Sequence, residues 1–196
     1  MTRSERYRQL IQVAWKLVRE EGSDALTLGR LAERSDVAKP VVYDHFATRA
    51  DLLAALYREF DSRQTAAMAR ALASSEATLP SRAAVIASAY VDCALGQGRE
   101  ISGVIAALAG SPELEQVRRD CEVEFAQQCR AALAPFAPGR RISPAGLWAF
   151  LGAAEALSYA ALNGDISARQ AKNELSETIV AMVMRQTRPG RSRSSG

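Results

Sequence analysis

The sequence predicts an all-α protein, and three observations support this fold class. Alanine, the residue with the highest intrinsic helix propensity, supplies 37 of the 196 residues. Valine and isoleucine together number 19, no more than leucine alone, which is too few strand-forming residues for a barrel, a sandwich or a doubly wound sheet. Apolar residues also recur at intervals of three and four along most of the chain, as they do on one face of a helix.

The boundaries of the predicted helices rest on residues that favour helix ends. We expect Ser4 to cap the first helix and Gly22 to follow its end in a left-handed conformation. Thr27 is a favourable N-cap for the second helix, and Pro40, which lacks an N–H, fits only in the first turn of the third. In order, the nine predicted helices cover about residues 4–21, 28–34, 39–44, 49–73, 81–96, 99–109, 112–134, 144–163 and 168–186.

Several classes of site are excluded by composition. The chain has three cysteines, Cys93, Cys121 and Cys129, and no C-x-x-C pair, so neither a disulfide scaffold nor a cysteine-rich metal site is expected. His45 is the only histidine. No stretch resembles a phosphate loop, a nucleophile elbow or a pair of catalytic carboxylates. We therefore expect no enzymatic activity, no cofactor and no bound metal.

No segment is expected to enter a membrane. The first ten residues, MTRSERYRQL, lack the apolar core of a signal peptide, so a cytoplasmic location is expected. The longest nearly uncharged stretch, residues 142–163, contains Glu155 and two glycines, which are poor material for a membrane span. We interpret this stretch as a buried helix.

The charges are distributed unevenly along the chain. The net charge is +3, but residues 1–63 carry 11 basic and 10 acidic residues, whereas the last twelve residues carry four arginines and no acid. Net charge is therefore weak evidence for a nucleic-acid partner, and any such prediction must rest on where particular residues lie. The predicted organisation is an N-terminal domain at residues 4–63, a helical domain at 64–187 and a disordered basic tail at 188–196.

The second and third predicted helices have the lengths of a helix-turn-helix. They are short, a break at residues 35–37 separates them, and Lys39-Pro40 opens the second of the pair. In that motif the second helix enters the major groove of DNA, and its first residues reach the base edges. Lys39 can donate to guanine or phosphate there, while Pro40 and Val41 offer apolar surface to thymine methyl groups.

A longer pattern surrounds these two helices. Its most specific run is VVYDHFATRADLL, at residues 41–53, and the other matching positions are Arg8, Ala14, Leu17, Gly22, Thr27, Arg30, Leu31, Ala32 and Val37. Over about residues 4–63, the sequence resembles the N-terminal domain of the TetR family of bacterial transcriptional regulators. Two positions depart from that pattern: Asp36 stands where a glycine is common, and Ala38 stands where serine or threonine is common.

The resemblance implies a homodimeric, ligand-responsive repressor that binds a near-palindromic double-stranded DNA operator. It also implies phosphate contacts from Tyr43 and His45, and Arg49 would add an ionic contact. Plainer alternatives exist: Tyr43 in the core with a solvated hydroxyl, His45 as an ordinary surface histidine, and Arg30 on a solvated helix face. The predicted DNA-binding set is Thr27, Arg30, Ala38, Lys39, Pro40, Val41, Tyr43, His45 and Arg49. Phe46 is assigned to the core.

The last two predicted helices each carry an apolar stripe with spacings of three and four. Two such stripes at the end of one chain indicate a four-helix dimer interface, and the alternative is an intramolecular core. The predicted interface residues are Leu147, Phe150, Ala154, Leu157, Leu175, Ile179, Met182 and Val183.

Scattered polar and aromatic residues between residues 81 and 163 are consistent with a chamber for a small-molecule effector. If Glu155 is buried there, it would bind a cation or a hydrogen-bond donor. At the edge of the apolar stripe it would instead be solvated. The alanine-rich surroundings favour a hydrophobic effector. The predicted ligand-binding residues are Tyr90, Cys93, Cys121, Trp148 and Glu155.

Two other functions remain open at this point. A helical small-molecule binding protein or enzyme can keep this fold without binding DNA, and the near-neutral first 63 residues and Ala38 favour that alternative. A regulator that activates transcription is not distinguishable from a repressor by sequence.

Overall fold

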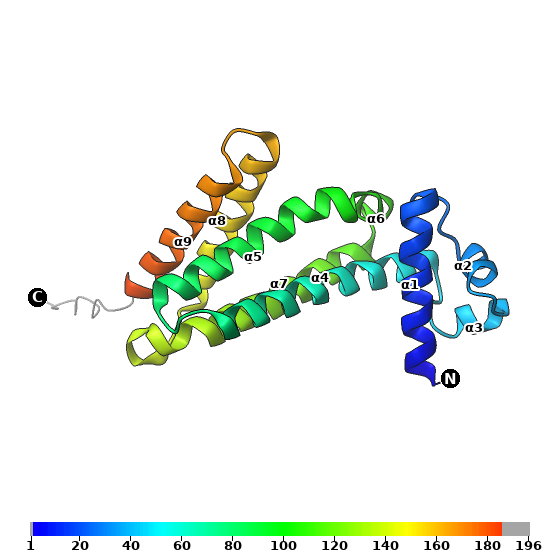
Figure 1. The fold of residues 1–196 in the computed structure, drawn as a ribbon, viewed down its shortest axis with the longest axis horizontal. Coiled ribbons are helices and arrows are strands. Elements are labelled where there is room, and N and C mark those ends of the chain that lie inside the picture. Colours follow the sequence, from blue (N-terminus) through cyan, green and yellow to red (C-terminus); the bar gives the residue numbers. More distant parts are fainter. Residues whose placement is uncertain (1, 186–196) are drawn as a thin grey trace, which may run out of the picture. The chain divides into compact units, whose positions relative to one another are not determined.

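The computed structural model describes residues 2–185, without the side chains of residues 97–100 and 140 (Figure 1). Within this range the chain is helical and has no strand, so the all-α prediction is confirmed. Its α-helices are α1 (Arg3–Glu21), α2 (Leu28–Arg34), α3 (Lys39–Tyr43), α4 (Arg49–Ser74), α5 (Leu79–Glu100), α6 (Ser102–Leu108), α7 (Pro112–Leu133), α8 (Pro144–Asn163) and α9 (Ala168–Arg185). Two short 3₁₀ helices lie at Ala134–Phe136 and Pro138–Arg140.

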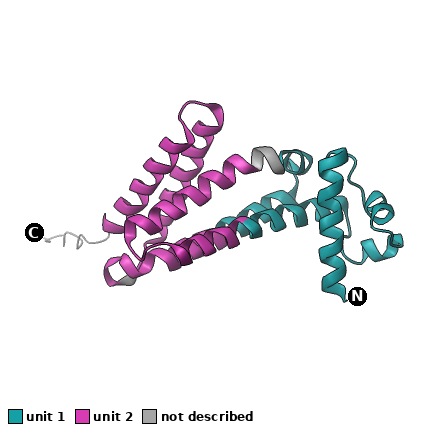
Figure 2. Cartoon of the chain, in the orientation of Figure 1, with its two compact units in different colours: residues 1–63, 97–122 teal, residues 64–96, 123–196 magenta. Residues whose placement is uncertain are grey.

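The chain divides into two compact units (Figure 2). Unit 1 contains residues 1–63 and 97–122, and unit 2 contains residues 64–96 and 123–196. Helices α4, α5 and α7 therefore each contribute to both units. The division groups residues 97–122 with the N-terminal residues, whereas the sequence pattern treated the first 63 residues as a domain by themselves. The predicted disordered tail lies outside the described residues.

Unit 1 is built around the apolar faces of its first four helices. Leu10, Leu17, Leu31, Val42 and Phe60 are fully buried there. Burial of side chains of this size stabilises each helix by about 1.5–3 kcal/mol per residue, which short helices such as α2 and α3 need because they are marginal in isolation. The core of unit 1 thus holds α2 and α3 in place.

The start of α1 differs from the prediction. Thr2, rather than Ser4, is the N-cap: its hydroxyl oxygen accepts a hydrogen bond from the Glu5 N–H at 3.2 Å. The Glu5 carboxylate in turn accepts from the Thr2 N–H at 2.7 Å. This reciprocal capping box satisfies two N–H groups, whereas a cap at Ser4 has no such partner three residues later, where Tyr7 stands.

Helices α8 and α9 pack against each other and form the core of unit 2 together with residues of α4, α5 and α7. The eight residues predicted as a dimer interface lie in this core: seven are buried, and Leu157 packs against them. For these residues the intramolecular alternative is therefore the correct one. The seven buried residues are Leu147, Phe150, Ala154, Leu175, Ile179, Met182 and Val183. A helix can bury one apolar stripe in its own chain and present a second to solvent, and periodicity does not distinguish the two.

Helix α8 is long and apolar enough to cross a membrane by length and composition, the only such helix in the described part of the chain. It packs against α9, and five of its side chains are buried by the protein itself. These contacts support the interpretation that α8 packs within the protein rather than in a membrane.

The predicted break near residue 97 is absent. Helix α5 continues through Gly96 to Glu100, and α6 begins at Ser102. A glycine inside a helix costs only about 1 kcal/mol relative to alanine, so it ends a helix only where a left-handed cap follows.

Candidate nucleic-acid interface

The turn between α2 and α3 is fixed by local chemistry. The Thr27 hydroxyl oxygen accepts from the Arg30 N–H at 3.1 Å and caps α2, as predicted. Asp36 has a φ of 51°, in the left-handed region that glycine usually fills, and the Val37 N–H donates to the Ala32 carbonyl at 3.1 Å. Aspartate adopts this conformation more readily than bulkier residues do. Asp36 thus closes the turn in place of glycine.

Helix α3 has one buried side and one solvated side. Val42 is fully buried and Phe46, three residues after Tyr43, is 2% exposed, so the predicted core role of Phe46 is confirmed. Ala38, Lys39 and Pro40 are exposed, and Val41 is half-buried. Because five residues make little more than one helical turn, the buried side fixes the direction of the exposed side. The residues predicted to reach base edges therefore face solvent.

Tyr43 and His45 lie at the end of α3. Tyr43 is 54% exposed, which excludes the alternative of a core tyrosine. The ring of His45 is half-buried, with its centroid 6.0 Å from that of Tyr7 and 6.2 Å from that of Phe46. Burial raises the pKa of the Tyr7 phenol. Tyr43 thus extends outward, whereas His45 is partly supported by an aromatic cluster.

The Arg30 guanidinium is engaged by carboxylates rather than directed to solvent alone. It lies 3.0 Å from a carboxylate oxygen of Glu21 and 3.4 Å from one of Glu33. The hydrogen bond from Arg30 lowers the pKa of the Glu21 carboxyl, and the same hydrogen bond raises the pKa of the Arg30 guanidinium. Arg34 also pairs with Glu20 and lies 3.8 Å from Glu21. These ion pairs join the end of α1 to α2.

Arg49, at the start of α4, donates to backbone carbonyls. Its Nε lies 2.7 Å from the Leu26 oxygen, and its Nη2 lies 2.7 Å from the Ser23 oxygen. Thr48 caps α4, with its hydroxyl oxygen accepting from the Asp51 N–H at 3.1 Å. The contact that the structure shows for Arg49 is therefore to the loop between α1 and α2.

Two basic residues that the sequence interpretation omitted lie beside α3. Arg3 donates through Nη2 to the Asp44 carbonyl at 3.2 Å, and Arg3 and Arg6 both line one surface pocket. Their spacing of three residues places both on one face of α1, a signal present in the sequence. What the sequence could not supply is which face of α1 lies beside α3.

The five predicted ligand-binding residues are divided between the two units. Cys121 belongs to unit 1, whereas the other four belong to unit 2. Trp148 is 56% exposed and Glu155 is also exposed, so the solvated alternative holds for Glu155. Tyr90 packs against Phe125 with ring centroids 5.4 Å apart, and Cys93 is half-buried. None of the five lines the pocket described next.

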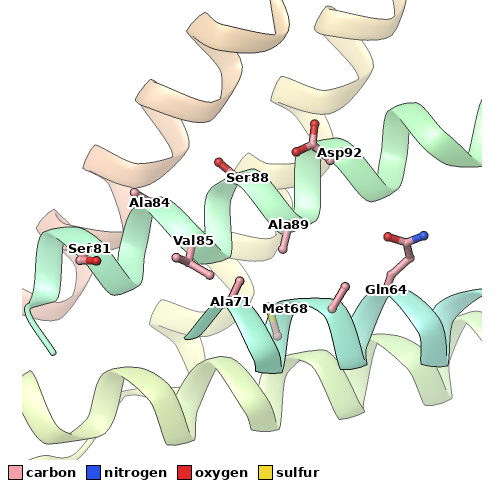
Figure 3. Close-up of a pocket in the computed structure, with 10 residues that line it drawn as sticks. Gln64, Met68, Ala71, Ser81, Ala84, Val85, Ser88, Ala89 and Asp92 are labelled. Carbon is pink, nitrogen blue, oxygen red and sulfur yellow. The ribbon is translucent and has the colours of Figure 1, made fainter. Parts of the chain in front are cut away.

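Unit 2 contains a pocket of about 460 Å³ between α4 and α5 (Figure 3). Alanine, valine and methionine side chains and Ser88 form its middle, Gln64 and Asp92 lie toward one end, and Ser81 lies toward the other (Figure 3). Lys172 of α9 donates to the Asp92 carboxylate at 2.7 Å. The complete lining is Gln64, Ala67, Met68, Ala71, Ser81, Ala84, Val85, Ser88, Ala89 and Asp92.

Comparisons with solved structures show which fold this is. A TetR transcription regulator from Haloarcula marismortui is 15% identical, with a TM-score of 0.65 over 92% of this chain and 99% of that chain. The fatty acid degradation regulator FadR from Bacillus halodurans is 12% identical, with a TM-score of 0.57 over 96% of both chains. The multidrug binding protein EbrR, solved with imidazole, is 24% identical, with a TM-score of 0.57 over 89% of both chains. No curated protein sequence matches the chain.

A family model matches the residues that build the interface described above. Residues 10–56 fit the model of bacterial regulatory proteins of the tetR family, and this span runs from the core of α1 through α2 and α3 into α4. Residues 10–56 thus match the TetR family model, and the solved structures show that the fold along nearly the full length of the chain is the fold of TetR-family regulators.

Proposed function

We propose that this protein is a homodimeric repressor that binds a near-palindromic DNA operator in the cytoplasm and leaves it when a hydrophobic small molecule binds. The observation that carries the proposal is the solvated face of α3, held outward by the buried Val42. A rigid, exposed helix start of this kind fits the major groove, which is about 12 Å wide.

The proposed DNA contacts follow from exposure and chemistry. Lys39 donates to guanine or phosphate, and Pro40 and Val41 contact thymine methyl groups. Tyr43 and Thr27, both exposed, donate their hydroxyl groups to phosphate oxygens. Arg30 and Arg49 support DNA binding indirectly, because their guanidinium groups hold α2 and the loop before it in position.

We assign the dimer interface to the exposed side of α8. That side is largely apolar, and Glu155, which is exposed on the same side, is the only charged residue in the helix. Nothing lies within 4 Å of a Cβ placed on Gly152, so a second helix can approach closely there. Besides Glu155, the exposed residues of this side, which recur at three- and four-residue spacing, are Ala145, Trp148, Ala149, Gly152, Ala156, Tyr159 and Leu162.

We assign the effector to the pocket between α4 and α5. Its middle is apolar apart from Ser88, which suits a hydrophobic molecule, and its ends offer a few polar groups that can orient one. Helix α4 lines this pocket through Gln64, Met68 and Ala71, and the same helix begins at Arg49 in unit 1. A ligand that prefers one position of α4 thereby changes the affinity for DNA, provided that the two forms bind it unequally. Two proteins of this fold are described as a fatty acid degradation regulator and a multidrug binding protein.

The test is a selection from a pool of random DNA duplexes with the full chain at low salt. We expect enrichment of one near-palindromic sequence whose half-sites lie one helical turn, about 34–36 Å, apart, bound by two protomers. If no duplex is retained at low salt, the proposal fails, and a small-molecule binding protein that kept the fold becomes the better explanation.

A further inference from the structure

The pocket between α4 and α5 presents one charged side chain to a ligand. Among its described lining residues, Asp92 is acidic and none is basic. Gln64, with a neutral amide, lies toward the same end as Asp92 (Figure 3). The other polar residues of the lining are Ser81 and Ser88, whose hydroxyl groups carry no charge. A ligand in this pocket therefore meets a carboxylate at one end.

Lys172 of α9 neutralises this carboxylate in the structure. Its Nζ lies 2.7 Å from Oδ1 and 2.7 Å from Oδ2 of Asp92, but Lys172 is not part of the described lining. The Asp92 side chain is 58% exposed and that of Lys172 is 28% exposed. Ion pairs with this much exposure contribute little, because water competes for both charges. A carboxylate also offers about four lone-pair sites. A ligand cation can therefore displace Lys172 from one oxygen at little cost.

The other charged residues of these two helices within unit 2 are Arg70 and Arg82, and neither lines the pocket. Arg82 follows Ser81 in sequence and donates to the Leu72 carbonyl. Arg70 is exposed. An anionic ligand consequently finds no basic side chain in the described lining, and it would have to compete with Asp92 for Lys172.

The rest of the lining suits an apolar body. Met68 is 2% exposed, whereas Ala67, Ala71 and Ala84 are exposed, so the pocket opens to solvent. Its volume of about 460 Å³ falls within the roughly 300–1,000 Å³ that pockets for small molecules have. A molecule with an apolar chain and one polar end matches this arrangement.

We propose that the effector is an organic cation, with a protonated amine that bonds to Asp92 and displaces Lys172 from at least one carboxylate oxygen. Its apolar body packs along Met68 and the neighbouring alanines. This inference rests on the proposed function, which assigns the effector to this pocket. A primary amine has a pKa near that of a lysine side chain, about 10.4, and is therefore protonated at neutral pH. An anion that took Lys172 would instead leave Asp92 unpaired beside a like charge.

Three probes with the same octyl chain separate charge from apolar contact: octylamine, octanol and octanoate. Isothermal titration calorimetry of the full chain at neutral pH, without DNA, gives the dissociation constant of each. The quantity compared is the preference ratio, the dissociation constant of octanol divided by that of octylamine. We expect a ratio of about two in the wild type, as for a partly exposed charge pair, and octanoate should bind most weakly.

Two variants change the charge at this end of the pocket. Asp92→Asn should lower the preference ratio to about one or less, because the carboxylate is lost and Lys172 becomes unpaired. Lys172→Met should raise it by roughly two- to fivefold, since the competing ammonium is removed. Asp165→Asn, at an exposed position after α8 and outside the lining, is the matched control and should keep the wild-type ratio.

A third variant locates the bound probe. Ala71 is an exposed residue of α4 in the lining, so a phenylalanine there should leave the fold intact and occupy the pocket. Ala71→Phe should weaken octylamine and octanol alike by roughly tenfold, because both lose apolar contacts. Unchanged affinities in this variant would mean that the probes bind elsewhere, which overturns the inference.

The cation assignment is wrong if octylamine does not bind, or if the preference ratio is the same in the wild type, Asp92→Asn and Lys172→Met. It is also wrong if octanoate binds most tightly, because the pocket then takes an anion. The titrations contain no DNA and are independent of the duplex selection. If no duplex is selected but the ratio changes as expected, the repressor function fails and the cation site stands. If a duplex is selected while the ratio stays constant, the cation site alone fails.

Discussion

Single arginines determine how the helix-turn-helix is held in this protein. Arg49 and Arg30 resemble DNA contacts in the sequence, yet the structure shows them bonded within the chain. Their partners, the carbonyls of Ser23 and Leu26 and the carboxylate of Glu21, lie far away in sequence. Only the packing of α2 and of the start of α4 against the end of α1 and the loop after it reveals them.

Arg49→Ala should lower the free energy of unfolding. The substitution removes two hydrogen bonds of 2.7 Å to half-buried carbonyls, and hydrogen bonds to charged groups contribute about 1.5–3 kcal/mol each before solvent screening. Since the Arg49 side chain is 37% exposed, we expect a total loss of about 1–2 kcal/mol in urea unfolding. Arg19→Ala, on an exposed part of α1, should change it by less than about 0.5 kcal/mol. Equal stabilities would show that the Arg49 contacts contribute nothing.

Cys129 should resist alkylation in the native protein. Its side chain is fully buried in unit 2, and burial raises the pKa of its thiol, so the reactive thiolate is scarce at neutral pH. Mass spectrometry after brief iodoacetamide treatment should find Cys93 and Cys121, which are half-buried, modified before Cys129. Early modification of Cys129 would contradict the described core.

The elements were predictable where the sequence carries its own end signals. The bounds of α2 follow from the Thr27 cap, and those of α8 from Ser143 and Gly164, which adopts a left-handed φ of 82°. The break between α5 and α6 was misplaced because Gly96 is helical in the structure. The exposed tip of α3 was predictable from the motif, but the partners of Arg30 and Arg49 and the pocket beside Arg3 depend on how helices pack.

The turn before α3 supports a prediction of its own. Asp36→Gly should stabilise the protein by about 0.5–1 kcal/mol, because glycine adopts the φ of 51° without the steric cost that a Cβ imposes. Asp36→Ala should destabilise it, since alanine cannot use a short polar side chain to support that conformation. Chemical denaturation of both variants gives the sign of each change in the free energy of unfolding. A stabilising Asp36→Ala substitution would contradict the left-handed turn.

At the scale of the whole molecule, the apolar stripes that periodicity assigned to a dimer interface are buried in the core of unit 2. The stripe of α8 that contains Phe150 is the core of the chain, whereas Trp148, Tyr159 and Leu162 are more than half exposed. Both stripes are largely apolar, although the exposed one also carries Glu155, and burial in the core of unit 2 separates them. The proposed interface therefore differs from the predicted one by its side of the helix.

Gly152→Arg should convert the dimer to a monomer. The position is exposed and open, so an arginine fits the folded chain, but it places a bulky charge in the proposed interface. Sedimentation equilibrium should give the mass of one chain, and affinity for a two-fold operator should fall at least tenfold because two linked reading helices become independent. Ala131→Arg, on an exposed position of α7, should remain a dimer. A dimeric Gly152→Arg variant would exclude this face.

The most direct test of DNA recognition by α3 is the DNA affinity of Lys39→Ala with Tyr43→Phe in the full chain. Both side chains are exposed, so the variant should keep its stability and oligomeric state while its affinity for the selected operator falls roughly tenfold to a hundredfold. Lys16→Ala, which removes the same charge from an exposed position on α1, should bind like the wild type. An unchanged affinity in the double variant would contradict the claim that α3 reads DNA.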